Sequence, residues 1–578
     1  MSEARIRSPS TKRPRSQSIR LRSRSTRGSA WRRRGRTARS RAGDRGGRGR
    51  RPRRPGRTRR RRPCPRGAWG RGRCSPRSRG SRGRRVRPDG RGRRRRRSGS
   101  RRGRGSSPCW SPGRRSVSSS IPSAGRRRRR RRGRRGRRVS GRVAGSSVEA
   151  PWVRIGVAAR GDRYPKVTPG RLRCVLTNWA GNVTFGARTV HRPTSLAELR
   201  GVVAAASRLR PLGTGHCFNR IADTTGDQVT LAAMPAVMEI DAGRLQVRVS
   251  AGVRYGELAS HLHSHGYALR NLASLPHISV AGAVATGTHG SGAANGSLAT
   301  AVRGLDLVTA SGDVLELRGE RLPGAVVALG ALGVVSAVTL EIVPTFDIAQ
   351  QVYERLPRET DLLEVLRGGY SVSLFTSWSG PTVDQVWRKS LGGAQPGGFF
   401  GATPAARPMH PIATEPADAC TQQLGVPGPW HERLPHFRLD FTPSSGDELQ
   451  SEYFVAAGDA GAAFAALDEI RDRIAPVLQI CEIRAIAADD LWLSPCQGRD
   501  TVAFHFTWKP DAAAVAPVLT AIEERLAAYA VRPHWGKLFS IAPETVAGLY
   551  PRFAAFAAFA AELDPQGKFR NDFLDAFL

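Results

Sequence analysis

Arginine dominates the first 150 residues, and this limits the part of the chain that can fold. Residues 1–150 hold 58 Lys and Arg residues against four acidic ones, with arginine runs at Arg93–Arg97 and Arg126–Arg132. So few apolar side chains cannot offset the entropy lost when a backbone becomes ordered, and the like charges repel one another. We therefore expect a disordered basic tail over residues 1–170, with the folded body behind it.

The net charge of +51 belongs to this tail, because residues 151–578 carry 38 bases against 41 acids. Three interpretations of the tail stay open. It is an arm that binds RNA or DNA through phosphate contacts, an unusually long transit peptide, or the translation of GC-rich DNA outside the true reading frame. It has no aromatic interleaving, zinc-ligand spacing or recognition helix of a specific nucleic-acid module.

The cysteines and the apolar runs argue against a metal site and a membrane span. Of the eight cysteines, five are scattered through residues 151–578 without a C-x-x-C pair, so neither a disulfide framework nor a zinc site is supported, and we expect no metal. The longest apolar run, Gly324–Leu340, is glycine-interrupted and is interpreted as a turn and a buried strand. We expect a cytoplasmic protein without membrane contact, and a monomer is favoured.

The body has the texture of alternating helices and strands. A capping box of Ser195 and Glu198 predicts a helix to about Arg208, and a second helix is expected over Tyr255–His265. The chain changes character after Pro344, where we place a domain boundary near residue 345. The expected strands are Gln228–Leu231, Leu245–Val249, Leu305–Thr309, Val314–Leu317, Val372–Trp378 and Val502–Trp508, and an apolar helical stripe is expected at Phe553, Phe556 and Phe559.

Two glycine-rich turns, Gly213–Cys217 and Ser279–Gly292, indicate a site for a pyrophosphate. Glycine permits positive φ and lets a bulky anion approach backbone N–H groups closely. A Rossmann turn is disfavoured, because the first turn lacks the third glycine and no acidic residue follows about twenty residues on. His216 lies inside the first turn, where a neutral imidazole is either a structural group or a nucleophile that attaches a cofactor covalently.

A second group of residues indicates a polar pocket. Glu482 and Arg484 are two apart in a strand-like run, so both side chains face the same way, and the pair is either a surface ion pair or suited to the vicinal hydroxyls of a polyol. His505 and Thr507 show the same alternation. Lys537 supplies a cation, which would stabilise negative charge that develops in such a pocket.

Several motifs in this order resemble the covalent-flavin oxidases of the vanillyl-alcohol oxidase superfamily, and within them the bacterial alditol (xylitol) oxidases. The motifs are TNWAGN from Thr177, GTGHCFN, NLASLPHISVAGAVATGTHGSG, VPGPWHERLPHFR, TPSSGDELQSEY, APVLQICEIR, HFTWKP, RPHWGKLF and DPQGKF. The resemblance spans roughly residues 175–578. Because a GTG codon encodes valine and can serve as a bacterial start, we expect the natural protein to begin close to Val175 with a net charge near zero.

The resemblance implies an α+β fold. It consists of a two-subdomain FAD-binding domain (171–345), a mixed α/β substrate-binding cap domain (346–540) and a C-terminal segment that returns to the FAD domain (541–578). His216 would carry a covalent 8α-histidyl FAD. Cys217 stands where relatives usually have serine, and a thiol would be a weaker donor to a phosphate. The other FAD contacts would be Pro211, Leu212, Gly213, Thr214, Gly215, Cys217, Ser274, Ser279, Gly282, Thr286, Gly287, Thr288, His289, Val335 and His534, with Val335 against the ring system.

The implied activity is oxidation of the terminal C1 hydroxyl of an alditol to the aldose, by hydride transfer to FAD, with O2 reduced to H2O2. Its alternatives are an aldonolactone oxidase, a flavin dehydrogenase with another acceptor, or a nucleic-acid-associating protein with an inactive oxidase-like body. The group that takes the hydroxyl proton is left open. The substrate contacts would be Ser274, Gln450, Glu482, Arg484, Thr507 and Lys537, and the catalytic residues Glu482, Arg484, His505 and Lys537.

Overall fold

The computed structural model describes residues 176–393, 397–441 and 446–578, which all fall in one compact unit. The predicted basic tail and the predicted start near Val175 lie outside the described residues. Among the residues that are described, no helix is long and apolar enough to cross a membrane.

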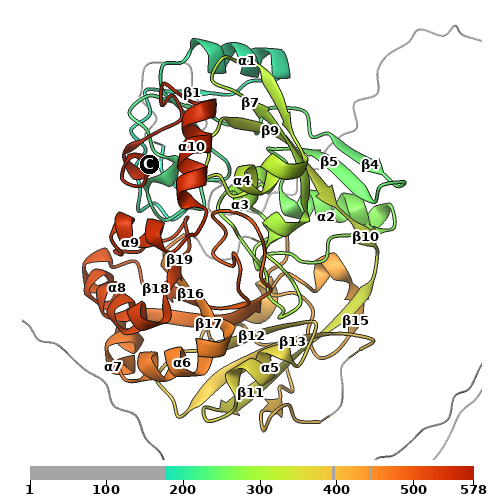
Figure 1. Cartoon of the computed structure of the whole chain (residues 1–578). Coiled ribbons are helices and arrows are strands. Elements are labelled where there is room, and N and C mark those ends of the chain that lie inside the picture. The colour runs from blue at the N-terminus through green and yellow to red at the C-terminus, as the bar shows by residue number, and fades with distance from the viewer. Residues whose placement is uncertain (1–175, 394–396, 442–445) are drawn as a thin grey trace, which may run out of the picture. The chain divides into compact units, whose positions relative to one another are not determined.

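The chain before residue 345 builds three small sheets (Figure 1). One is parallel with the order β1-β3-β2, one is antiparallel with the order β4-β5-β9-β7-β8, and β10 pairs with β6. The strand bounds are Thr189–His191 (β1), Leu209–Pro211 (β2), Asp227–Val229 (β3), Met238–Asp241 (β4), Gln246–Ser250 (β5), Tyr267–Ala268 (β6), Val302–Val308 (β7), Val314–Leu317 (β8), Val334–Glu341 (β9) and Val343–Pro344 (β10). The helices here are α1 (Leu196–Ala205), α2 (Tyr255–Ser264), α3 (Val280–Ala285) and α4 (Leu322–Val326).

Helix α1 begins as the sequence predicts but ends earlier. The Ser195 side chain accepts a hydrogen bond from the backbone N–H of Glu198. The reciprocal half of the predicted capping box is wrong, because the Glu198 carboxylate accepts from the backbone N–H and the hydroxyl of Thr194. The helix stops at Ala205, three residues before Arg208, because the next residue has an extended backbone that leads into β2.

The apolar stripes of the helices are partly buried as expected. In α1, Leu199 and Val203 pack in the core, whereas Leu196 is exposed. In α10 (Phe553–Leu563), Phe556 and Phe559 are buried. The apolar run from residue 324 to 340 holds the end of α4 as well as a turn and the buried strand β9, so its first part is helical where a turn was predicted.

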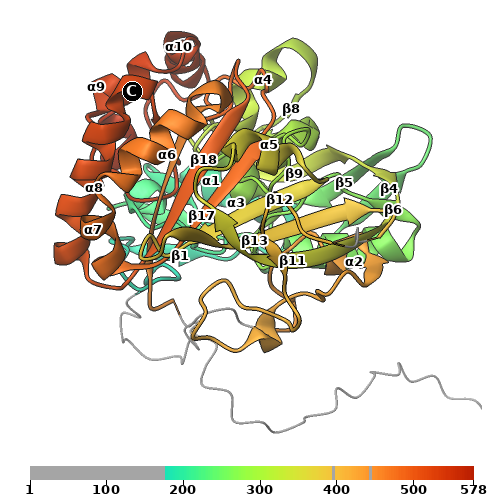
Figure 2. The same ribbon diagram turned by 90° about the horizontal axis from the view of Figure 1, so that it is seen from below.

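A nine-stranded antiparallel sheet follows residue 345 (Figures 1 and 2). Its order is β14-β11-β13-β12-β17-β18-β16-β19, and β15 pairs with β11. The bounds are Asp347–Pro357 (β11), Ser371–Thr376 (β12), Thr382–Leu391 (β13), Thr403–Pro404 (β14), Pro427–Pro429 (β15), Leu449–Ala456 (β16), Leu478–Ile486 (β17), Thr501–Trp508 (β18) and Arg532–Pro533 (β19). The helices connected to it are α5 (Leu362–Arg367), α6 (Ala460–Asp468), α7 (Arg471–Ile474) and α8 (Ala512–Leu526).

The alternation of side chains along this sheet separates a core face from a polar face. Ile483 of β17 and Phe504 and Phe506 of β18 pack in the same core as residues of α5, α6 and α8. Since successive strand residues point to opposite faces, Glu482 and His505, which are paired in register, point away from those helices. The sheet thus presents a polar face to the part of the chain before residue 345.

The C-terminal residues contact helix α1, strand β2 and the turn that follows β7. They form α9 (Pro543–Gly548), α10 and α11 (Asp572–Asp575). The buried Lys568 ammonium donates hydrogen bonds to the carbonyls of Val203 (2.8 Å) and Ala310 (2.7 Å). The backbone N–H of Leu209 donates to the Lys568 carbonyl (2.9 Å).

The domain boundaries at residues 345 and 540 stay a prediction. The change from the small sheets to the large sheet falls between Pro344 and Asp347.

Candidate active site

Two cavities adjoin at the glycine turns: one of about 330 Å³ runs from the turns to the polar face of the large sheet, and one of about 210 Å³ is lined by residues that precede residue 345. The first reaches from His216 to Glu482, and the second lies under the five-stranded sheet and is mostly apolar. They have lining residues in common, so the two cavities lie on opposite sides of the same residues. The shared residues are Leu212, Gly213, Thr214, Cys217, Ala222, Ser279, Gly282 and Thr286.

The first glycine turn is hydrogen-bonded to residues that precede it and to residues far behind it in the sequence. Gly215 has a φ of +72°, which a residue with a Cβ rarely adopts, and its carbonyl accepts a hydrogen bond from the backbone N–H of Trp179 (2.8 Å). The Phe218 N–H donates to the Gly536 carbonyl (2.8 Å), and the Asn219 side chain donates to the Lys537 carbonyl (2.8 Å). The turn therefore lies directly beside the segment that carries Lys537.

His216 is oriented within this turn. Its ring stacks on the indole of Trp179, with centroids 5.1 Å apart, and its Nδ1 lies 3.1 Å from the Thr214 hydroxyl oxygen. Burial, assisted by the nearby His277, lowers the pKa of His216 to about 4. The imidazole is therefore neutral at physiological pH and keeps a lone pair, as a nucleophile requires.

The two glycine turns meet at Ser279 and leave a polar atom without a partner. The Ser279 hydroxyl is buried and makes no hydrogen bond to any described residue. A Cβ on Gly213 would come 2.5 Å from this oxygen, and one on Gly282 would come 2.8 Å from it. The hydroxyl is thus a buried donor that lies between the backbones of two glycines. Such a donor fits a ligand with acceptor oxygens, such as the pyrophosphate of FAD.

The polar face of the large sheet brings the predicted substrate residues together. Strand pairing sets Gln450 opposite Thr507, and Glu482 opposite His505. The Gln450 side-chain oxygen lies 3.1 Å from His505 Nε2. Their strands, β16, β18 and β17, are neighbours in the sheet, so these side chains form one row along the first cavity.

Glu452 is the charge centre of this row, and the sequence prediction missed it. Its carboxylate accepts from Arg484 Nη2 (2.7 Å) and Lys537 Nζ (2.9 Å), and it lies 3.0 Å from His289 Nε2. Burial alone would raise the pKa of Glu452, but the charges of Lys537 and Arg484 and the hydrogen bond with His289 hold it well below that of an ordinary carboxyl. The signal was present, because Gln450 and Glu452 alternate along a strand as Glu482 and Arg484 do.

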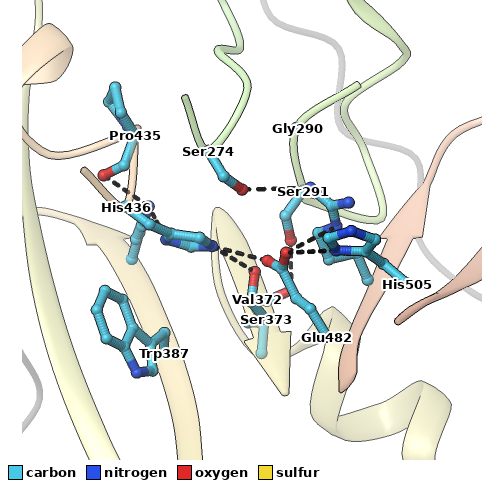
Figure 3. A network of polar contacts seen from close by, with 12 residues as sticks. Ser274, Gly290, Ser291, Val372, Ser373, Trp387, Pro435, His436, Glu482 and His505 are labelled. Carbon is cyan, nitrogen blue, oxygen red and sulfur yellow. Dashed lines mark hydrogen bonds and ion pairs between the residues drawn. The ribbon is translucent and has the colours of Figure 1, made fainter. Parts of the chain in front are cut away.

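Glu482 lies in a second polar cluster at the same cavity (Figure 3). Its Oε1 is 2.7 Å from His436 Nε2, and its Oε2 is 3.6 Å from Arg484 Nε and 3.7 Å from His505 Nδ1. Arg484 Nη1 donates to the Ser274 hydroxyl (3.4 Å). Burial would raise the pKa of Glu482, but Arg484 and His436 hold it well below the ordinary value, so the carboxylate is ionised.

The basic side chains of the site differ in whether they carry a charge. Burial lowers the pKa of Lys537 and Glu452 partly restores it. Burial, together with the Lys537 charge, lowers the pKa of His505 to about 4, and it lowers that of His534 well below the ordinary value. Lys537 and Arg484, which are both ion-paired with Glu452, line the cavity as cations, whereas His505 is neutral.

The structure brings most of the predicted site residues together in the first cavity. Pro211 and Val335 line only the second cavity, and Gly287 lines neither, so the predicted contact of Val335 with the flavin ring stays a prediction. Glu452, His436 and Trp179 were not predicted and also line the first cavity. The predicted residues found there are Leu212, Gly213, Thr214, Gly215, His216, Cys217, Ser274, Ser279, Gly282, Thr286, Thr288, His289, Gln450, Glu482, Arg484, His505, Thr507, His534 and Lys537.

Two family models match the chain. The model described as an FAD binding domain matches residues 187–318, and the model described as D-arabinono-1,4-lactone oxidase matches residues 448–577. The first match contains both glycine turns, and the second contains Glu452, Glu482 and Lys537.

Known proteins match about two thirds of the chain. The alditol oxidase of a Streptomyces species is 54% identical over 405 residues, which are 69% of this chain and 98% of that protein. The L-gulono-1,4-lactone dehydrogenase of Mycobacterium tuberculosis is 30% identical over 424 residues, again 69% of this chain and 98% of that protein. The L-gulonolactone oxidase of Bos taurus is 27% identical over 444 residues, 69% of this chain and 97% of that protein.

Solved structures share the fold at low identity. A solvent-stable cholesterol oxidase superposes with a TM-score of 0.58 at 16% identity, covering 69% of this chain and 96% of that one. A chitooligosaccharide oxidase gives a TM-score of 0.55 at 14% identity, covering 68% of this chain and 93% of that one. This likeness bears on the fold alone, and it confirms the α+β fold class predicted from the sequence.

Proposed function

The chain belongs to the family of FAD-dependent oxidoreductases that contains alditol oxidase and the aldonolactone oxidases, and on this premise we propose that it oxidises the terminal C1 hydroxyl of an alditol to the aldose. Molecular oxygen is the electron acceptor, and hydrogen peroxide is the second product. One observation carries the proposal: the row of charged and polar side chains around Glu482 and Arg484 meets the glycine turn of His216 in a single cavity.

The residues of the two glycine turns would hold FAD. The Ser279 hydroxyl, which has no hydrogen-bond partner among the described residues, and the close approach at Gly213 and Gly282 fit its pyrophosphate, and both cavities open beside these residues. When bound, FAD supplies the acceptor for the hydride and passes the electrons on to oxygen. The protein's own contribution is binding, orientation and electrostatics.

Glu482, Arg484 and Lys537 would hold the polyol through its hydroxyl groups. The ionised Glu482 accepts hydrogen bonds from vicinal hydroxyls, and the two cations donate to them. Since Arg484 and Lys537 are both bound to Glu452, their positions are fixed before the substrate enters. Such preorganisation reduces the entropy cost of bringing the C1 carbon to its reacting position.

Two groups of the chain can accept the hydroxyl proton at neutral pH. His505 is neutral because its pKa is about 4, and Glu482 is ionised because its pKa is held low. Both face the same cavity and lie next to each other, with His505 Nδ1 3.7 Å from Glu482 Oε2. Either fulfils the geometric requirement of a general base within reach of the pocket.

Peroxide release tests the proposed function. We expect the purified holoenzyme to release peroxide with xylitol and sorbitol. We expect the Arg484→Met variant to lose this activity, because the buried carboxylates of Glu452 and Glu482 would then lack the guanidinium that pairs with both of them. Peroxide from an aldonolactone but not from a polyol would favour the alternative, an aldonolactone oxidase. Reduction of an artificial dye without peroxide would show a dehydrogenase instead.

The covalent link at His216 is proposed from the same turn and has its own test. We expect wild-type protein precipitated in acid to give a yellow, fluorescent pellet, and His216→Ala to give a colourless one, because only a covalent bond survives unfolding. Since the pKa of His216 is about 4, attachment should proceed equally well above pH 5 and fail as the pH falls through 4 and the ring becomes protonated. His265→Ala, at an exposed histidine after α2, is the matched control. Release of flavin from the wild-type pellet would rule the bond out.

A further inference from the structure

Lys389 is a buried lysine that the proposed reaction leaves unused. It lies on β13, where strand pairing places it opposite Ser371 of β12, on the same face of the sheet as Glu482. Its Nζ donates to the carbonyl of Leu434, lies 3.5 Å from that of Pro435 and lies 3.2 Å from His436 Nδ1. Three acceptors around one nitrogen match an ammonium group, which has three donors and no acceptor.

His436 connects this lysine to the proposed substrate carboxylate. Its ring is fixed edge-on to Trp387 (centroids 5.0 Å apart) and to Phe375 (5.5 Å). Its Nε2 is 2.7 Å from Glu482 Oε1 (Figure 3). Burial, strengthened by the Lys389 charge, lowers the pKa of His436 to about 4, so the ring is neutral and has a single N–H.

We propose that Lys389 and His436 are positioning residues for Glu482. The ammonium of Lys389 donates to His436 Nδ1, which leaves the one imidazole proton on Nε2, and Nε2–H donates it to Glu482 Oε1. The tautomer is thus fixed from outside the cavity, and the carboxylate is held by one oxygen. This inference rests on the proposed polyol oxidation, in which Glu482 accepts hydrogen bonds from the substrate.

The contact with His436 determines which carboxylate oxygen of Glu482 is available to a substrate. With Oε1 occupied by His436, Oε2 is the oxygen nearer to Arg484 and His505. The backbone N–H of His436 also donates to the Ser274 carbonyl (3.1 Å), so the same residue fixes the neighbouring segment. A histidine with the opposite tautomer would present a lone pair to the carboxylate, and the two would repel each other.

Variants at both positions test the inference by a split between KM and kcat. Since a hydrogen bond to a charged group carries about a tenfold effect, we expect His436→Leu and Lys389→Met each to raise KM for the polyol about tenfold with kcat changed less than about threefold. His436→Gln keeps a donor near the Nε2 position and should recover most of the affinity. The assays are run at pH 6, because burial lowers the pKa of Lys389 to about 7 and the ammonium form prevails below it.

The pH profile separates positioning from simple packing. His436 is one of the groups that hold the pKa of Glu482 low, so its loss should move the acid limb of kcat/KM upward by about one pH unit in His436→Leu, and less in His436→Gln. The matched control is Lys568→Met, another buried lysine bound to backbone carbonyls but lining neither cavity. It should lower the thermal unfolding temperature and leave KM and the acid limb unchanged.

Nitrogen NMR on histidine-labelled holoenzyme provides a readout that does not depend on turnover. We expect His436 to show a protonated Nε2 and an unprotonated Nδ1 in the wild type, and to lose this fixed tautomer in Lys389→Met. A protonated Nδ1 in the wild type, or an unchanged KM and acid limb in His436→Leu, would overturn the inference. If the wild type itself releases no peroxide from polyols, the proposed function fails. The NMR result still tests the Lys389–His436 contact in that case, because it does not depend on turnover.

Discussion

Replacing Glu452 with leucine should lower the free energy of unfolding by about 3–5 kcal/mol, because removing one partner of a buried ion cluster leaves its other charges uncompensated. The carboxylate is 1% exposed and binds both Arg484 and Lys537, which approach the same cavity. Without it, two largely buried cations lie near each other and lose the carboxylate that both of them bind. We also expect polyol oxidation to fall below detection, since both cations lose their fixed positions.

Urea unfolding of the holoenzyme measures the first effect, and peroxide release measures the second. The matched control is Glu469→Leu, because Glu469 pairs with Arg525 at 2.6 Å but both side chains are about half exposed. Exposed pairs contribute roughly 0–1 kcal/mol. Glu452→Gln retains the side-chain shape and separates packing from charge. If Glu452→Leu and Glu469→Leu destabilise the protein equally, Glu452 does not hold the site together.

Replacing Lys537 with methionine should lower kcat by about 10²–10³, the range found when one preorganised charge or donor is removed from a reacting centre. The ammonium lies 2.9 Å from Glu452 and lines the first cavity beside the turn of His216. Its backbone carbonyl accepts a hydrogen bond from the Asn219 side chain beside that turn, and its ammonium would stabilise negative charge that develops during oxidation. Methionine keeps most of the volume and removes only the charge.

The pH dependence of kcat gives this prediction a second readout. Because burial lowers the pKa of Lys537, the stabilising cation is present below that pKa and is lost as the pH rises through it, earlier than for an ordinary lysine. The wild type should therefore show an alkaline limb that Lys537→Met lacks. Lys509→Met, at an exposed lysine bound to the Pro476 carbonyl, should behave as the wild type. An unchanged kcat in Lys537→Met would exclude the electrostatic role.

Strand alternation made much of the site predictable. Glu482 with Arg484 and His505 with Thr507 were expected to share a face because side chains alternate along a strand, and both pairs line the first cavity. The glycine turn around His216 was also expected, because few ordinary cores tolerate such a run of small residues. These features are local, so the residues themselves carry the information.

Contacts between residues that lie far apart in the sequence were not predictable in this way. His436 lies in a loop 46 residues before Glu482, and its contact depends on how β12 and β17 pair. Glu452 showed the same alternation as Glu482, yet no nearby cation in the sequence marked it as a charge centre. The early end of α1 and the Thr194 contact of Glu198 likewise depend on packing and loop geometry.

The contacts between the first glycine turn and the last part of the chain also bear on how the protein is made. The Phe218 N–H is bound by the Gly536 carbonyl, and the strand that leads into the turn is bound through Leu209 by the Lys568 carbonyl. A ribosome synthesises the turn more than three hundred residues before these partners emerge. The proposed cofactor site is therefore completed only after residues 534–571 have been synthesised, and a chain that lacks these residues is left with an open half-site.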